Sequence, residues 1–126
     1  MSPLRSRRQR ARDTTTAGLV RVRVDPSTKT LTKRLEPGEV AVIDHMDIDR
    51  VSAEALVRIG PSAVLNAAPS SSGRYPNLGP DILVSAGVAL VDDLGPAIME
   101  LVEGDLVRVD GGTVYDPQGS VVAEGT

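Results

Sequence analysis

Two kinds of apolar pattern predict strands in the first part of the chain. Residues 19–24 alternate between aliphatic and arginine side chains, which predicts a half-buried strand. After the turn at Asp25, residues 31–35 predict a short return strand. Uninterrupted aliphatic runs, typical of strands buried on both faces, occur at residues 40–43, 63–65 and 88–91.

Helical spacing and capping residues separate these runs. Residues 51–59 carry apolar side chains at helical spacing, and either Asp47 or Asp49 can cap this helix. Asn77 can cap a second, shorter helix that leads into the last aliphatic run. Residues 95–102 predict a further helical turn or two.

The period returns to that of strands near the end of the chain. Residues 106–109 and 114–115 predict two strands joined by a tight glycine turn, and residues 121–122 a further one. Strands and helices thus alternate in the middle of the chain, with hairpins at both ends. This order predicts an α/β fold, a layered β/β/α domain with a central, partly parallel sheet and flanking β-hairpins.

Composition narrows the function classes. The chain has 126 residues, enough for one domain, and it contains no Phe, Trp or Cys. The shortage of aromatic rings argues against base stacking on single-stranded nucleic acid. The lack of cysteine excludes disulfides, thiol catalysis and thiolate metal sites, and it fits the cytoplasmic location that we expect. No apolar run is long enough to cross a bilayer.

Charge divides the chain into a basic arm and an acidic body. Residues 1–34 hold ten lysines and arginines against two acids, whereas residues 35–126 hold four against fifteen. Residues 1–16 lack apolar periodicity, so we predict a disordered arm followed by one domain over residues 17–126. The arm could contact an acidic partner, a membrane surface or nucleic acid, but a solubilising tail is the favoured interpretation.

A polar loop over residues 66–80 holds the candidate ligand-binding residues. Arg74 could grip a phosphate or carboxylate beside the amides that begin the following helix. The structural alternative, weighed about evenly, is that Asn77 caps that helix and Arg74 pairs with Asp44 or Asp92. The candidate ligand-binding residues are Ser71, Ser72, Gly73, Arg74, Tyr75 and Asn77.

Other polar residues are expected at the ends of the parallel strands. Aspartates there could hold Mg²⁺ if they converge, although capping and solvation are the commoner explanation. His45 is the single histidine, so it completes neither a metal site nor a catalytic triad. A polar strand-end residue held by neighbouring acids is the favoured interpretation. We therefore predict no catalytic and no metal-binding residue. The strand-end aspartates are Asp44, Asp47, Asp49, Asp92 and Asp93.

The order of three segments resembles the swivelling phosphohistidine domain of PEP-utilising enzymes. The segments are Leu-Glu-Pro-Gly-Glu-Val at residues 35–40, Ala-Gly-Val-Ala-Leu-Val at 86–91 and Val-Glu-Gly-Asp-Leu-Val-Arg-Val-Asp-Gly at 102–111. That resemblance implies a mobile domain with a phosphorylated histidine at a helix start. Because the corresponding position here falls at about Leu78, phosphate transfer is not expected.

Longer strings carry a more specific resemblance. Ala-Val-Ile-Asp-His at residues 41–45, Asn-Ala-Ala-Pro at 66–69 and Ser-Gly-Arg-Tyr-Pro-Asn-Leu-Gly-Pro at 72–80 occur in fixed order. They resemble the N-terminal region of SteA-type bacterial cytokinetic ring proteins, which are described as thiamine pyrophosphokinase-like. The similarity spans residues 18–126 and implies that a nucleotide-binding, kinase-like domain would follow beyond Thr126.

The resemblance implies a non-catalytic interaction or ligand-recognition domain of a cell-division protein. Its expected partners are another domain or subunit of a cell-division complex, a second copy of the chain, or a phosphate-bearing ligand. The expected location is the cytoplasm, with recruitment to the division septum. The alternative is the substrate- or nucleotide-binding part of a thiamine pyrophosphokinase-like transferase. No cofactor is expected in this chain, whereas a nucleotide with Mg²⁺ belongs to the parent family.

Overall fold

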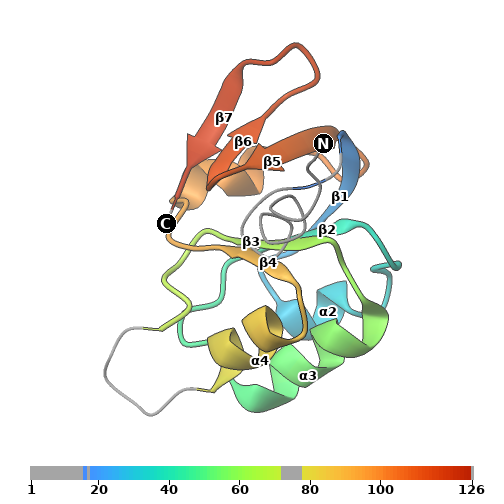
Figure 1. Ribbon diagram of the computed structural model, residues 1–126, viewed down its shortest axis with the longest axis vertical. Helices are drawn as coiled ribbons and strands as arrows, with labels where there is room; N and C mark the ends of the chain where they lie inside the picture. Colours follow the sequence, from blue (N-terminus) through green and yellow to red (C-terminus); the bar gives the residue numbers. More distant parts are fainter. Residues whose placement is uncertain (1–15, 17, 72–77, 126) are drawn as a thin grey trace, which may run out of the picture.

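A curled seven-stranded sheet organises the domain (Figure 1). The computed structural model describes residues 16, 18–71 and 78–125. The spatial order of the strands is β4-β3-β2-β1-β5-β6-β7. The strands are β1 (Val20–Val24), β2 (Val40–Ile43), β3 (Ala63–Asn66), β4 (Ala89–Val91), β5 (Leu106–Asp110), β6 (Thr113–Tyr115) and β7 (Val121–Glu124). The helices are α2 (Thr28–Leu31), α3 (Arg50–Ile59), α4 (Gly79–Ser85) and the 3₁₀-helix η1 (Pro96–Glu100).

Strands β1 to β4 form a parallel half of the sheet. Each pairs in parallel with the next one along the chain, from Val22 against Val40 to Leu65 against Val91. Helices α2, α3 and α4 supply the crossovers and lie together on one side of the sheet (Figure 1). The predicted α/β class and the partly parallel sheet are therefore confirmed.

The predicted return strand at residues 31–35 is wrong, and so is the hairpin expected at the start of the domain. Residues 28–31 form helix α2, because the Ser27 hydroxyl accepts a hydrogen bond from the amide of Thr30 and caps the turn. Leu31, the last residue of this helix, is fully buried. Strand β1 consequently crosses over to a parallel partner instead of folding back on itself.

The two longer helices begin and end differently. The Asp49 carboxylate caps α3 by accepting the Ser52 amide at 2.7 Å, and Gly60 ends the helix in the left-handed region with φ 83°. Helix α4 has Leu78 at its N-cap position and no side-chain cap there. The predicted cap, Asn77, lies outside the described residues and does not occupy the N-cap position.

Strands β5 to β7 form an antiparallel half of the sheet. Strand β5 pairs with β1 only at two positions, after which Gly104 and Asp105 exchange backbone hydrogen bonds with Val22. The predicted hairpin of β5 and β6 is confirmed, and β7 adds a third antiparallel strand. Gly125, just after β7, packs so closely on the end of β4 that an added Cβ would overlap the carbonyl of Asp92. The sheet thus curls into a half-barrel.

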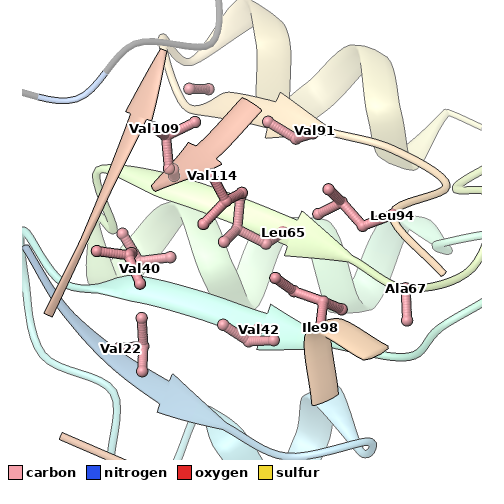
Figure 2. Packing of buried hydrophobic residues seen from close by; sticks show 13 residues of the cluster. Val22, Val40, Val42, Leu65, Ala67, Val91, Leu94, Ile98, Val109 and Val114 are labelled. Carbon is pink, nitrogen blue, oxygen red and sulfur yellow. The ribbon is translucent and has the colours of Figure 1, made fainter. Parts of the chain in front are cut away.

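Two buried clusters lie on opposite faces of the parallel strands. Alternate residues explain both: Val40 and Val42 point into the curled sheet, whereas Ala41 and Ile43 point toward the helices. In the first cluster, side chains of both sheet halves meet beneath Ile98 of η1 (Figure 2). Small aliphatic side chains suffice to fill it because β5 and β6 fold over the parallel strands.

Thr16 belongs to the folded domain, although the sequence placed it in the basic arm. Its amide donates to the carbonyl of Val109 at 2.8 Å, and its hydroxyl accepts the Val109 amide at 3.0 Å. The chain is thereby tied to β5 before β1 begins. The remainder of the predicted arm, residues 1–15, lies outside the described residues. Within the described ranges, no helix combines the length and apolarity that a membrane span requires.

Candidate recognition site at the carboxyl edge of the sheet

The carboxyl ends of the parallel strands meet at one edge of the domain, where the candidate loop begins. Ser71 is the only predicted ligand-binding residue within the described part of the chain, and it is exposed. The interactions proposed for the other candidates are therefore not described. Those residues are Ser72, Gly73, Arg74, Tyr75 and Asn77.

Asn66, the last residue of β3, organises this edge. It is fully buried, and its side chain makes four hydrogen bonds. Its Oδ1 accepts the amides of His45 and Ala68, at 3.0 and 3.1 Å. Its Nδ2 donates to the carbonyl of His45 and to the Ser70 hydroxyl, at 2.8 and 2.9 Å. A buried amide with all these partners fixes the path of the chain after β3.

Residues 66–70, here called the pedestal segment, are held by hydrogen bonds from their backbone to neighbouring segments. The amide of Ala67 donates to Ile43, and that of Ser70 donates to the Asp92 carboxylate at 2.7 Å. Every carbonyl of the segment accepts an amide from the loop after β2 or the loop after β4. The donors, from residue 66 to residue 70, are Leu94, Gly95, Asp93, Asp47 and Ile48, at 3.0, 2.9, 3.3, 3.1 and 2.9 Å.

Ile48 holds both ends of the candidate loop. On one side its amide donates to the carbonyl of Ser70. On the other side its carbonyl lies against Gly79, where an added Cβ would overlap that oxygen. Gly79 therefore starts α4 because no other residue allows the two backbones to approach so closely. Residues 71–78 therefore connect Ser70 to Gly79, and both of these residues contact Ile48.

The strand-end aspartates serve mainly the backbone. Hydrogen bonds from the Ser52 amide and from the Ser52 hydroxyl hold the pKa of Asp49 below its ordinary value. Asp47 and Asp93 adopt positive φ values of 56° and 53°, and this turns their amides toward the pedestal segment. In the part of the chain that the structure describes, no three acidic or histidine side chains converge as a metal site would need.

His45 lies at the end of β2, as the sequence favoured, but its hydrogen-bond partners are Thr28 and Asn66 and not the neighbouring acids that were expected. Its Nδ1 lies 2.8 Å from the hydroxyl of Thr28, a buried residue at the start of α2. Its backbone amide and carbonyl are both bonded to Asn66. The histidine therefore joins α2 to the pedestal segment.

A charged cluster at the end of β1 was not foreseen from the sequence. The Glu103 carboxylate accepts the Val24 amide at 2.7 Å, and Arg34 donates to the Val24 carbonyl at the same distance. Arg34 and Glu103 also form an ion pair, with Nε and Oε2 2.6 Å apart. This pair, here called the clasp, supplies β1 with hydrogen bonds beyond its last partner on β5, Leu106, where β5 begins. The Arg34 guanidinium lowers the pKa of Glu103 to about 2.

A cavity of about 350 Å³ lies between α2 and α3. This cavity could not be predicted either, because one of its walls is helix α2, next to which the sequence pattern predicted a strand at residues 31–35. The capping signal of Ser27 after the Asp-Pro turn could have indicated this helix. The cavity, here called the α2–α3 pocket, is lined by Thr28, Lys29, Thr32, Asp49, Val51, Ser52 and Ala55.

Comparisons with protein-family models, with curated proteins and with solved structures find no match. The resemblances to SteA-type proteins and to swivelling domains thus stay predictions from the sequence.

Proposed function

We propose that this chain is a non-catalytic interaction and ligand-recognition domain of a SteA-like bacterial cell-division protein. In this proposal, residues 71–78 form the recognition loop. The loop presents the arginine, tyrosine and serine side chains of the matching sequence string to another domain, a second copy or a phosphate-bearing ligand. The sequence resemblance supports the proposed family. The anchoring of both loop ends in the domain supports the proposed role of the loop.

The observation that carries the proposal is the anchoring of both loop ends on Ile48. Before the loop, the pedestal segment has its carbonyls bonded to two neighbouring loops. After the loop, Gly79 packs against the Ile48 carbonyl. Binding loops are commonly positioned in this way by a rigid scaffold, which lowers the entropy lost when a partner binds.

The alternative, a nucleotide-binding part of a thiamine pyrophosphokinase-like transferase, has no comparable observation in its favour. The Asp92 carboxylate accepts the Ser70 amide, so it is used within the fold at this edge. The described residues hold no cluster of three acidic or histidine side chains for Mg²⁺.

Septal recruitment tests the proposal in cells. A fluorescent fusion of the whole chain should gather at the division septum of its bacterial host. Replacing residues 72–77 by glycine and serine should abolish this, while the same replacement at residues 116–119, the turn between β6 and β7, should not. Circular dichroism checks that both variants fold. Septal fluorescence that survives loss of the loop would overturn its recognition role.

Calorimetric titration separates the two functions. The purified chain is titrated with ATP, thiamine and inorganic phosphate, each with and without Mg²⁺. The transferase alternative requires Mg²⁺-dependent ATP binding that Arg74→Ala removes and Arg58→Ala leaves unchanged. The recognition proposal expects no such Mg²⁺ dependence. Phosphate binding lost in Arg74→Ala alone would identify the ligand of the loop as an anion.

A further inference from the structure

We propose that the α2–α3 pocket binds a small zwitterion, a molecule that carries an ammonium and a carboxylate group, such as a free amino acid. Neither Ser71 nor Leu78, the described residues of the recognition loop, lines this pocket. The proposal therefore rests on other residues than the function proposed above.

The size and position of the cavity suit a small ligand. Its volume of about 350 Å³ lies at the lower end of the range of roughly 300–1,000 Å³ for small-molecule pockets. Its walls come from the two helices that follow β1 and β2. They therefore lie beyond the carboxyl ends of parallel strands, where open α/β sheets bind their ligands.

Opposite charges line the two walls without neutralising each other. Lys29 comes from α2 and Asp49 from α3. Within the described residues Lys29 takes part in no ion pair, with Asp49 or with any other acid. Hydrogen bonds from the Ser52 amide and hydroxyl lower the pKa of Asp49 and so favour its ionised form. Residues of opposite charge, one on each helix, thus line the same cavity.

This pair of charges favours a dipolar ligand over an ion of either sign. A simple anion would be attracted by Lys29 and repelled by Asp49, and a simple cation would meet the reverse. A zwitterion can place its carboxylate toward Lys29 and its ammonium toward Asp49, so that both interactions are favourable. Val51 and Ala55 provide an apolar wall for an aliphatic body, and Val51 is 75% exposed.

The hydroxyl groups of the walls hold the pocket in shape. The Thr28 hydroxyl is bonded to His45, and the Thr32 hydroxyl donates to the carbonyl of Lys29 at 2.8 Å. The wall that carries Asp49 is fixed by its bond to the Ser52 amide. Charge recognition consequently falls to Lys29 and Asp49.

Nuclear magnetic resonance titration of the whole chain tests the proposal. The probes are glycine, L-valine and L-leucine, together with isovalerate and isobutylammonium, which each retain one charged group of valine. We expect saturable shifts of the amides in α2 and in the first turns of α3. Valine should bind about fivefold more tightly than either single-charge analogue, because each partly exposed ion pair contributes at most about 1 kcal/mol. Absence of saturable shifts with all three amino acids would overturn the proposal, as would equal affinity for a single-charge analogue.

Matched variants assign the two charges. Lys29→Gln and Asp49→Asn should each weaken binding of the best amino acid about fivefold. Asparagine retains the helix cap, so the second variant removes charge without removing the cap. Lys33→Gln and Asp81→Asn change charges outside the pocket and should leave the affinity unchanged. Equal effects of pocket and control variants would show that binding does not involve these walls.

Discussion

The pedestal segment and the α2–α3 pocket lie at the same edge of the sheet but use their polar groups in opposite ways. In the pedestal segment, Asn66 and the backbone carbonyls are bonded to protein partners. In the pocket, Lys29 faces a cavity and pairs with no acid that the structure describes. Polar residues at the end of a parallel strand therefore need not belong to a ligand site. The useful criterion is whether their hydrogen-bonding and charge requirements are already met within the fold.

Mutations in the two regions should differ in whether they change stability or ligand affinity. Removing a buried group that satisfies several partners leaves those partners unsatisfied, which costs stability. Removing a charge that faces an open cavity costs little stability but lowers affinity for a ligand of matching charge. Mutations can therefore separate the two regions by what they change, the free energy of unfolding or the dissociation constant.

Asn66→Ala is expected to have the largest effect. It leaves the amides of His45 and Ala68, the His45 carbonyl and the Ser70 hydroxyl without their buried partner. We expect a loss of about 3 kcal/mol in the free energy of unfolding, measured by urea denaturation. Ser71→Ala, an exposed neighbour, should change it by less than about 0.5 kcal/mol. Similar values for both variants would remove the distinction between pedestal and surface.

Gly79→Ala tests the second anchor of the loop. Alanine normally favours a helix over glycine by about 1 kcal/mol. Here the added Cβ would overlap the carbonyl oxygen of Ile48, which belongs to the backbone and cannot rotate away. We therefore expect a net loss of about 2 kcal/mol in unfolding free energy. Ser85→Ala, on the exposed side of α4, should be neutral or slightly stabilising. A stabilising Gly79→Ala would mean that Ile48 does not fix the loop.

The clasp is a charged counterpart of the pedestal segment, because Arg34 and Glu103 pair with each other and with the backbone of Val24. Glu103→Ala should cost about 1–2 kcal/mol at neutral pH, since the carboxylate bonds a backbone amide and a guanidinium but is partly exposed. Glu100→Ala, an exposed acid in η1, should have almost no effect. If both variants behave alike, the clasp contributes nothing to stability.

The pH dependence of the clasp has a defined sign. The pKa of Glu103 falls from an ordinary 4.5 to about 2 on folding, so its contribution is complete above pH 4.5 and disappears as the pH falls toward 2. The stability difference between the native chain and Glu103→Gln should consequently shrink between pH 5 and pH 3 in urea denaturation series. A difference that stays constant over that interval would contradict the lowered pKa.

Local patterns were sufficient for the parallel strands and for α3. Uninterrupted aliphatic runs located β2, β3 and β4. Helical spacing located α3, and of the two caps that the sequence offered, Asp47 and Asp49, the structure uses Asp49. Helix α2 was missed because four residues are too short to show helical periodicity. The antiparallel pairing of β1 with β5 could not be predicted either, because it joins segments far apart in the sequence.

The candidate site was harder to predict, because its contacts also join segments that are far apart in the sequence. Asn66 follows an apolar run and looks like a loop residue, but the loops after β2 and β4 fold over it and bury it. Arg34 and Glu103 are 69 positions apart, so no local spacing indicates the clasp. The cap at Asp49 was predictable because capping is local. Residues whose partners are distant in sequence need the folded chain.

The smallest expected effect on stability comes from Lys29, and it completes the comparison. Lys29→Gln should change the free energy of unfolding by less than about 0.5 kcal/mol, because the ammonium has no acidic partner among the described residues. At the opposite wall, Asp49→Ala should cost about 1 kcal/mol by removing the cap of α3, whereas Asp49→Asn should cost much less. Urea denaturation of the three variants measures all of these values. A loss near 2 kcal/mol in Lys29→Gln would place Lys29 with Asn66 among the groups that hold the fold together, and the opposing charges of the pocket would then need no ligand to explain them.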